Sequence, residues 1–123
     1  SGSAVAAWEA HLARLDERAA ALDARRLRSV RFVADGTDLR VGLHAGHRWR
    51  TARLRTTAGI PFVVNLPTEE VFTAPDRRQA DGRVRVARPV VAAGDRLEGV
   101  ELEFRGGAVV RASAAAGGDV LER

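Results

Sequence analysis

The sequence predicts an α+β fold, in which a long N-terminal helix packs on a mostly antiparallel β-sheet. An apolar stripe with helical spacing near the start of the chain indicates the helix. The alternation of apolar and polar residues that begins at Leu27 indicates the strands. The chain has 123 residues, of which 46% are hydrophobic, and this suffices for one domain with a core but not for two domains.

The N-terminal helix is expected to run from about Ala4 to Arg26. Its stripe consists of residues spaced three and four apart, namely Val5, Trp8, Leu12, Leu15, Ala19 and Leu22. The stripe is too short for a coiled coil, so a sheet is its favoured partner and a second helix is the minor alternative. Ser1-Gly2-Ser3 resembles the remnant of an expression tag, and residues 4–123 are therefore expected to form the single domain.

Short strands joined by glycine-containing turns are expected to make up the rest of the domain. The turns are predicted at residues 35–38, 81–82 and 105–107, where Asp-Gly or Gly-Gly pairs occur. The apolar residues of the predicted strands are, in chain order, Val30 and Phe32; Leu39, Val41 and Leu43; Ile60 to Leu66; Val84, Val86 and Val90; Val100, Leu102 and Phe104; and Val109. A further strand over residues 47–55 and a short helix near Asp119 are also considered. In this arrangement Arg83 and Arg85 face Glu101 and Glu103 across the sheet.

Composition excludes several classes of protein. There is no cysteine, which excludes a disulfide, a thiolate nucleophile and a cysteine-ligated zinc site. All 20 basic residues are arginine, so a lysine nucleophile is excluded as well. No apolar run approaches the ~20 residues that cross a bilayer, and no signal peptide is recognisable. A membrane is therefore not an expected partner, and the cytoplasm is the expected compartment.

A basic segment offers the main alternative to an enzyme. Arg48, Arg50, Arg53 and Arg55 interleave with Trp49, and an exposed strand of this kind could stack a base and neutralise phosphates. Such a strand would make the chain a binding module for nucleic acid or an acidic partner. The net charge of only +4 favours a solvated edge strand instead, with much of the positive charge neutralised locally. Nucleic acid is therefore not the expected partner.

The histidines supply a second candidate site. His44 and His47 form an H-x-x-H pair, and together with Glu70 they could hold one metal ion in an independent small enzyme. Gly46 and the flanking strands favour a turn with hydrogen-bonded histidines over a metal site. His11 lies outside the apolar stripe of the helix and is expected at the surface or its rim.

Adjacent carboxylates supply the third and most informative candidate. Glu69 and Glu70 lie in a proline-bounded segment, residues 65–75, that leaves a predicted strand and contains the apolar Val71 and Phe72. A carboxylate held in such a loop could ligate a cation or act as a base. The Thr-x-Glu step fits a turn or a helix N-cap equally well, so the residues alone leave these alternatives open.

The same segment, Asn65-Leu66-Pro67-Thr68-Glu69-Glu70-Val71-Phe72-Thr73-Ala74-Pro75, resembles the signature of the aminopeptidase T and aminopeptidase S (thermophilic aminopeptidase) family of dinuclear metallo-aminopeptidases. Further matches follow in order over nearly the whole chain, at residues 37–43, 46–49, 59–62, 81–84, 97–99 and 104–110. The resemblance implies an exopeptidase that removes N-terminal residues from peptides, with a dimeric body and two divalent ions, zinc or cobalt. It implies that Glu70 is the first metal-binding carboxylate, and it assigns no role to Glu69, His44 or His47.

The resemblance covers only a middle segment of the family's pattern. Family members are several hundred residues long, and their remaining ligands, a glutamate, two histidines and an aspartate, are expected after this segment. One protein carboxylate does not fix the geometry of two metal ions. The chain is therefore expected to be a fragment of the metal-bearing domain, with Glu70 as its metal ligand, no catalytic residue, and neither activity nor tight metal binding of its own.

Overall fold

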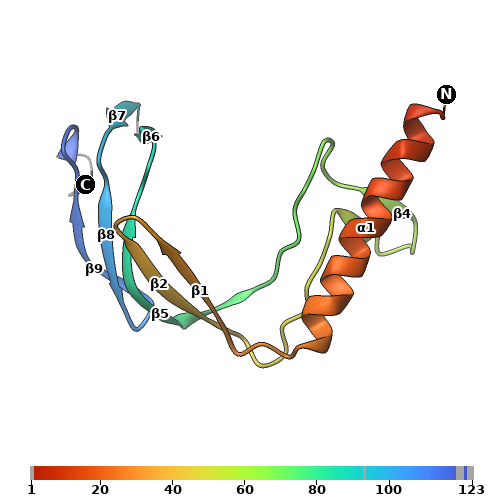
Figure 1. Cartoon of the computed structure of the whole chain (residues 1–123), viewed down its shortest axis with the longest axis horizontal. Coiled ribbons are helices and arrows are strands. Elements are labelled where there is room, and N and C mark those ends of the chain that lie inside the picture. Colours follow the sequence, from red (N-terminus) through yellow and green to blue (C-terminus); the bar gives the residue numbers. More distant parts are fainter. Residues whose placement is uncertain (1, 93, 119–120, 122–123) are drawn as a thin grey trace. The chain divides into compact units, whose positions relative to one another are not determined.

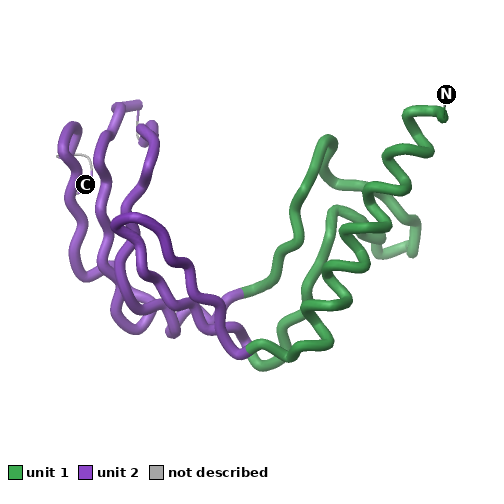
Figure 2. Tube along the Cα trace, viewed as in Figure 1, with its two compact units in different colours: residues 1–27, 45–74 green, residues 28–44, 75–123 purple. Residues whose placement is uncertain are grey.

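The computed structural model describes residues 2–92, 94–118 and 121 of the chain. The chain forms two compact units, which Figure 2 colours separately. Unit 1 comprises Ser1–Leu27 and Ala45–Ala74, and unit 2 comprises Arg28–His44 and Pro75–Arg123. Unit 1 contains the helix and unit 2 contains the large antiparallel sheet, whose elements are labelled in Figure 1. The expected α+β composition is confirmed, whereas the packing of the helix on that sheet stays a prediction.

Helix α1 spans Ala4–Ala24, which agrees with the helix expected from the apolar stripe. It begins at Ser3, whose Oγ accepts a hydrogen bond from the Ala6 backbone N–H at 3.1 Å, so a residue attributed to a tag remnant caps the helix. The chain leaves the helix at Arg26, which has a positive φ of 47°. Most of the stripe is shielded from solvent: Leu12, Leu15 and Ala19 are buried, Trp8 and Leu22 are half-buried, and Val5 is exposed.

Two short strands complete unit 1, β3 (Arg53–Arg55) and β4 (Pro61–Val63), and they pair in antiparallel fashion. The strand considered over residues 47–55 is thus limited to its last three residues. The residues just before β3 form hydrogen bonds with parts of unit 1 that are far away in the sequence. Among these, Arg50 forms an isolated antiparallel bridge with Phe72.

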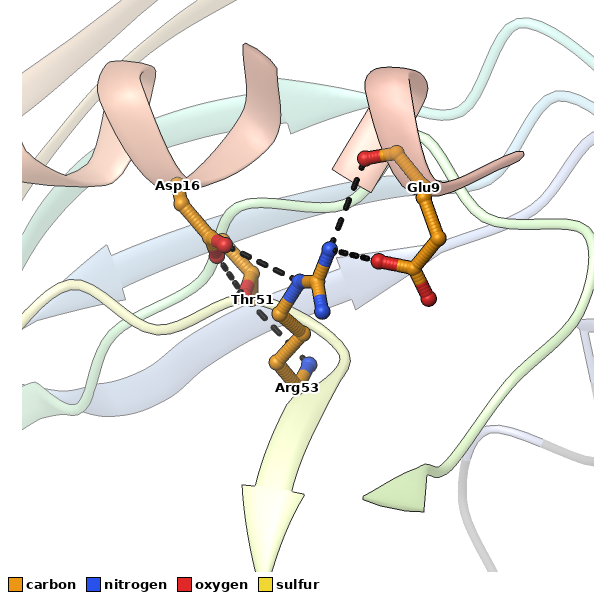
Figure 3. A network of polar contacts seen from close by, with 4 residues as sticks. All are labelled: Glu9, Asp16, Thr51 and Arg53. Atoms are coloured by element: carbon orange, nitrogen blue, oxygen red, sulfur yellow. Dashed lines mark hydrogen bonds and ion pairs between the residues drawn. The ribbon is translucent and has the colours of Figure 1, made fainter. Parts of the chain in front are cut away.

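A polar network attaches the start of β3 to helix α1 (Figure 3). The Arg53 guanidinium forms ion pairs with Glu9 Oε2 at 2.6 Å and with Asp16 Oδ2 at 3.0 Å. The Thr51 hydroxyl donates a hydrogen bond to Asp16 Oδ1 at 2.6 Å. Because Asp16 binds both Thr51 and Arg53, it fixes the segment between them against the helix, and Thr51 and Ala52 are buried there.

Unit 2 is built on a five-stranded antiparallel sheet in the order β1-β2-β5-β8-β9. Its strands are β1 (Ser29–Ala34), β2 (Thr37–Leu43), β5 (Pro75–Arg85), β8 (Glu101–Arg105) and β9 (Ala108–Ser113), and a second small sheet pairs β6 (Val90–Ala92) with β7 (Asp95–Leu97). The turns predicted at residues 35–38 and 105–107 are confirmed, because they join the hairpins β1–β2 and β8–β9. The buried apolar residues of this unit are Leu43, Leu97 and Val100.

The turn predicted at Asp81-Gly82 is wrong. Both residues lie inside β5, which is one continuous strand of 11 residues. Gly82 has a φ of 126°, and a Cβ at this position would collide with the carbonyl oxygen of Asp38 on the neighbouring strand β2. The glycine is therefore required by the close approach of two backbones, and an Asp-Gly pair in the sequence does not distinguish this use from a turn.

The expected opposition of Arg83 and Arg85 to the glutamates of β8 is confirmed as strand register, with Arg83 opposite Glu103. The ion pair of Arg85, however, is made with Asp35 in the β1–β2 turn at 2.9 Å. The helix considered near Asp119 falls on residues that lie largely outside the described part of the chain.

Gly82→Ala is expected to lower the free energy of unfolding by about 1–3 kcal/mol, because the added Cβ meets the Asp38 carbonyl at a backbone angle that L residues rarely adopt. Urea denaturation followed by circular dichroism measures the difference. Gly118→Ala is the matched control, since a Cβ at that position would have no atom within 4 Å. Equal stability of the two variants would contradict the role assigned to Gly82.

Arg53→Ala is expected to lower the free energy of unfolding by about 1 kcal/mol, because Glu9 and Asp16 both lose a cation at a partly shielded position. Arg50→Ala serves as the control, since Arg50 is exposed and its side chain forms no ion pair within the described part of the chain. Thermal unfolding, followed by the circular dichroism of the helix, compares the stabilities of the two variants. A loss in Arg53→Ala no larger than that in the control would show that the network adds no stability.

Candidate functional site

The loop between β4 and β5 carries the adjacent carboxylates Glu69 and Glu70, and its backbone is fixed on both sides of them. On the N-terminal side, Oγ1 of the buried Thr68 accepts a hydrogen bond from the Glu70 backbone N–H at 3.2 Å. On the C-terminal side, Phe72 exchanges two backbone hydrogen bonds with Arg50, at 2.8 and 2.9 Å. Glu70 therefore lies between two fixed points of the chain.

A histidine of helix α1 contacts the same loop. His11 Nε2 lies 2.8 Å from the Thr68 carbonyl oxygen and 3.4 Å from Glu69 Oε1. The His11 side chain is only 15% exposed, and its ring centroid lies 5.1 Å from that of Trp8. The expected rim position of His11 agrees with this partial burial. Its contact with the loop was not expected, because 57 residues separate His11 from Thr68 and no local pattern connects them.

The two adjacent glutamates have different surroundings. Glu69 contacts His11, whereas the Glu70 carboxylate forms no hydrogen bond or ion pair in the part of the chain that the structure describes. Glu70 is exposed, so its charge stays hydrated and needs no protein partner. A hydrated carboxylate on a fixed backbone suits a divalent cation, because hard cations prefer oxygen ligands. The expected place of Glu70 in this loop is confirmed, and its role as a ligand stays a prediction.

The donors of the described residues do not complete a metal centre. Among residues 2–92, 94–118 and 121, no three His, Cys, Asp or Glu side chains are grouped so that they could hold a metal ion. His44 and His47 flank the turn at Ala45-Gly46, as expected, and both take part in interactions within the chain. A one-metal site made of His44, His47 and Glu70 therefore has no support. Glu70 fits a metal ion as a single ligand that other residues must supplement.

The arginines of the basic segment do not form one unpaired patch. Arg53 binds two carboxylates of helix α1, and Arg48 Nη1 lies 3.8 Å from the Asp23 carboxylate. The indole N–H of Trp49 is buried, so this ring is not fully presented for stacking on a base. The ion pairs of Arg48 and Arg53 agree with the expected local neutralisation of charge in this segment, and the absence of a nucleic-acid partner stays a prediction.

The sequence and fold of this chain are similar to those of known proteins. The sequence profile of the thermophilic metalloprotease (M29) family matches residues 1–123. The chain is 45% identical to aminopeptidase T of Thermus thermophilus over 119 residues, which are 97% of this chain and 29% of that protein. It is 39% identical to aminopeptidase PepS of Streptococcus thermophilus and 36% identical to aminopeptidase AmpS of Bacillus subtilis, in each case over 96% of this chain and 29% of the relative.

A solved structure of a relative has a similar fold. Wild-type AmpT from Thermus thermophilus aligns with a TM-score of 0.87 and 45% sequence identity, and the alignment covers 98% of this chain and 30% of that one. The chain thus spans somewhat less than a third of the length of the relatives it matches. The resemblance drawn from the motif around Glu70 is confirmed, and the chain belongs to the thermophilic metalloprotease (M29) family.

Proposed function

We propose that this chain is a segment of a metal-dependent aminopeptidase, a hydrolase that removes N-terminal residues from peptides, and that residues 4–123 belong to its metal-bearing domain. The observation that carries the proposal is the 45% identity to aminopeptidase T of Thermus thermophilus over 97% of the chain. The loop of Thr68, Glu69 and Glu70 supports it, because the loop backbone is fixed while one carboxylate is open to a cation.

Glu70 is the metal ligand in this proposal. Glu69 is not, because its carboxylate contacts His11 instead. The metal ions are two divalent cations, zinc or cobalt, which in such enzymes polarise the scissile carbonyl and lower the pKa of a water molecule. The contribution of this chain is to hold the Glu70 carboxylate at a constant position, through the hydrogen bond at Thr68 and the bridge at Phe72.

The isolated chain is proposed to be catalytically inactive. A catalytic zinc site commonly uses about three protein ligands and keeps one position open. Glu70 supplies one ligand, and the described residues hold no complete donor group around it. The remaining ligands, a glutamate, two histidines and an aspartate, are proposed to come from polypeptide outside residues 1–123.

The proposed enzyme acts on peptides in the cytoplasm, and a homodimer is its proposed assembly. Among the described residues, no helix combines the length and the apolar character that crossing a membrane requires. Neither a membrane nor a nucleic acid is a proposed partner.

The 123-residue chain is expected to bind zinc weakly and to release no leucine from leucine amide, because one carboxylate does not hold a metal pair. Calorimetric titration with zinc and an amine-release assay measure the two properties. In the complete enzyme, Glu70→Gln is expected to remove nearly all activity and most bound metal, whereas Glu69→Gln keeps most of both. Submicromolar zinc binding by this chain, with turnover that Glu70→Gln abolishes, would contradict the proposed inactivity.

Binding of this chain to nucleic acid is expected to be weak and nonspecific at physiological salt, because two of the basic segment's arginines pair with carboxylates of helix α1. Fluorescence anisotropy with single-stranded and duplex DNA, at several salt concentrations, measures it. Trp49→Ala is expected to change nothing. Sequence-selective binding that resists added salt and disappears in Trp49→Ala would favour a nucleic-acid-binding module instead.

A further inference from the structure

The contact between His11 and the Thr68 carbonyl determines the hydrogen-bonding state of the histidine. A carbonyl oxygen only accepts hydrogen bonds, so His11 Nε2, at 2.8 Å, must carry the proton. On the other side of the ring, Nδ1 lies 3.3 Å from Nη2 of Arg14, a group that only donates. The neutral Nε2–H tautomer satisfies both contacts, and the ring is therefore oriented from both ends.

Thr68 connects this histidine to Glu70. The Thr68 carbonyl accepts from His11, and the Thr68 hydroxyl oxygen accepts from the Glu70 backbone N–H at 3.2 Å. Thr68 is 5% exposed, so water does not readily replace either bond. Movement of the Thr68 backbone would therefore move the Glu70 backbone, whose other side is held by the bridge between Phe72 and Arg50.

We propose that His11 is a positioning residue for the metal ligand Glu70, acting through Thr68. Glu69 belongs to the same arrangement, since its Oε1 lies 3.4 Å from His11 Nε2 and so faces the histidine. The adjacent glutamates differ in position: Glu69 lies beside His11 with its side chain 78% exposed, and Glu70 is open to the cation in this proposal. This inference rests on the proposed function, because it assigns a purpose to the position of Glu70.

Residues that orient metal ligands through hydrogen bonds typically change metal affinity or activity by about 10–100-fold when they are removed. His11→Ala in the complete enzyme is therefore expected to weaken zinc binding by about 10–100-fold. His11→Gln is expected to restore most of the affinity, because its side-chain amide can donate to the Thr68 carbonyl from a similar position. Rescue by glutamine separates positioning from a general loss of packing.

The experiment measures the zinc dissociation constant by chelator competition, with kcat and KM, in the complete enzyme. The variants are His11→Ala, His11→Gln, Glu70→Gln and the control Leu12→Ala. Leu12 is fully buried on the same helix, so its replacement costs stability without removing a hydrogen-bonding group. All variants are compared at a temperature where each is folded. Amide hydrogen exchange at Glu70 in the metal-free protein gives a readout that does not depend on activity.

We expect His11→Ala to exchange the Glu70 amide hydrogen faster and to bind zinc more weakly than the unmodified enzyme. His11→Gln is expected to return both properties close to their original values, and Leu12→Ala is expected to change neither. Loss of metal in Glu70→Gln together with unchanged affinity in His11→Ala would overturn the role of His11 alone. Full activity and metal content in Glu70→Gln would overturn the proposed function and, with it, the role of His11. Equal losses of affinity in His11→Ala and Leu12→Ala, without rescue by glutamine, would reduce His11 to a packing residue.

Discussion

The polar contacts that helix α1 makes with distant segments of the chain determine where the rest of unit 1 lies. Among the described residues of this unit, the buried apolar ones are Leu12, Leu15, Ala19 and Ala52. Apolar burial is non-directional, so these residues favour compactness without selecting one arrangement of the loops. Asp16 and His11 add that direction, since they bind Thr51 and the Thr68 carbonyl at hydrogen-bond distance. The loop with Glu70 depends on this attachment.

Part of the positive charge of this protein is paired with carboxylates of its own chain. Among the described residues, six of its 20 arginines form ion pairs with carboxylates, namely Arg31, Arg48, Arg53, Arg85, Arg96 and Arg105. In unit 2, Arg31 forms two hydrogen bonds with Asp38 at 2.7 Å, and Arg85 pairs with Asp35. The hydrogen bond from Arg31, followed by its charge, holds the pKa of Asp38 below the ordinary value of a carboxyl group. Such pairs reduce the long-range field that would attract a phosphate backbone.

Adjacent identical residues are a problem for any assignment based on a motif. Glu69 and Glu70 have the same chemistry and neighbouring positions, so neither composition nor spacing separates them. In the structure the Glu69 carboxylate lies at a histidine, while the Glu70 carboxylate has no partner among the described residues. The distinction arises because Thr68 bonds back to the Glu70 amide, which fixes the backbone between the two side chains.

Local patterns in the sequence determined helix α1 and the hairpins β1–β2 and β8–β9, because each depends on residues close in the chain. They also located the loop of Glu70 through its motif. Only the tertiary structure decided the features that depend on distant residues. Position 82, inside β5, requires a glycine because the Asp38 carbonyl of the neighbouring strand leaves no room for a Cβ. His11 contacts Thr68, which is 57 residues away in the sequence. Neither contact leaves a periodic trace in the sequence, since each forms between segments that only folding brings together.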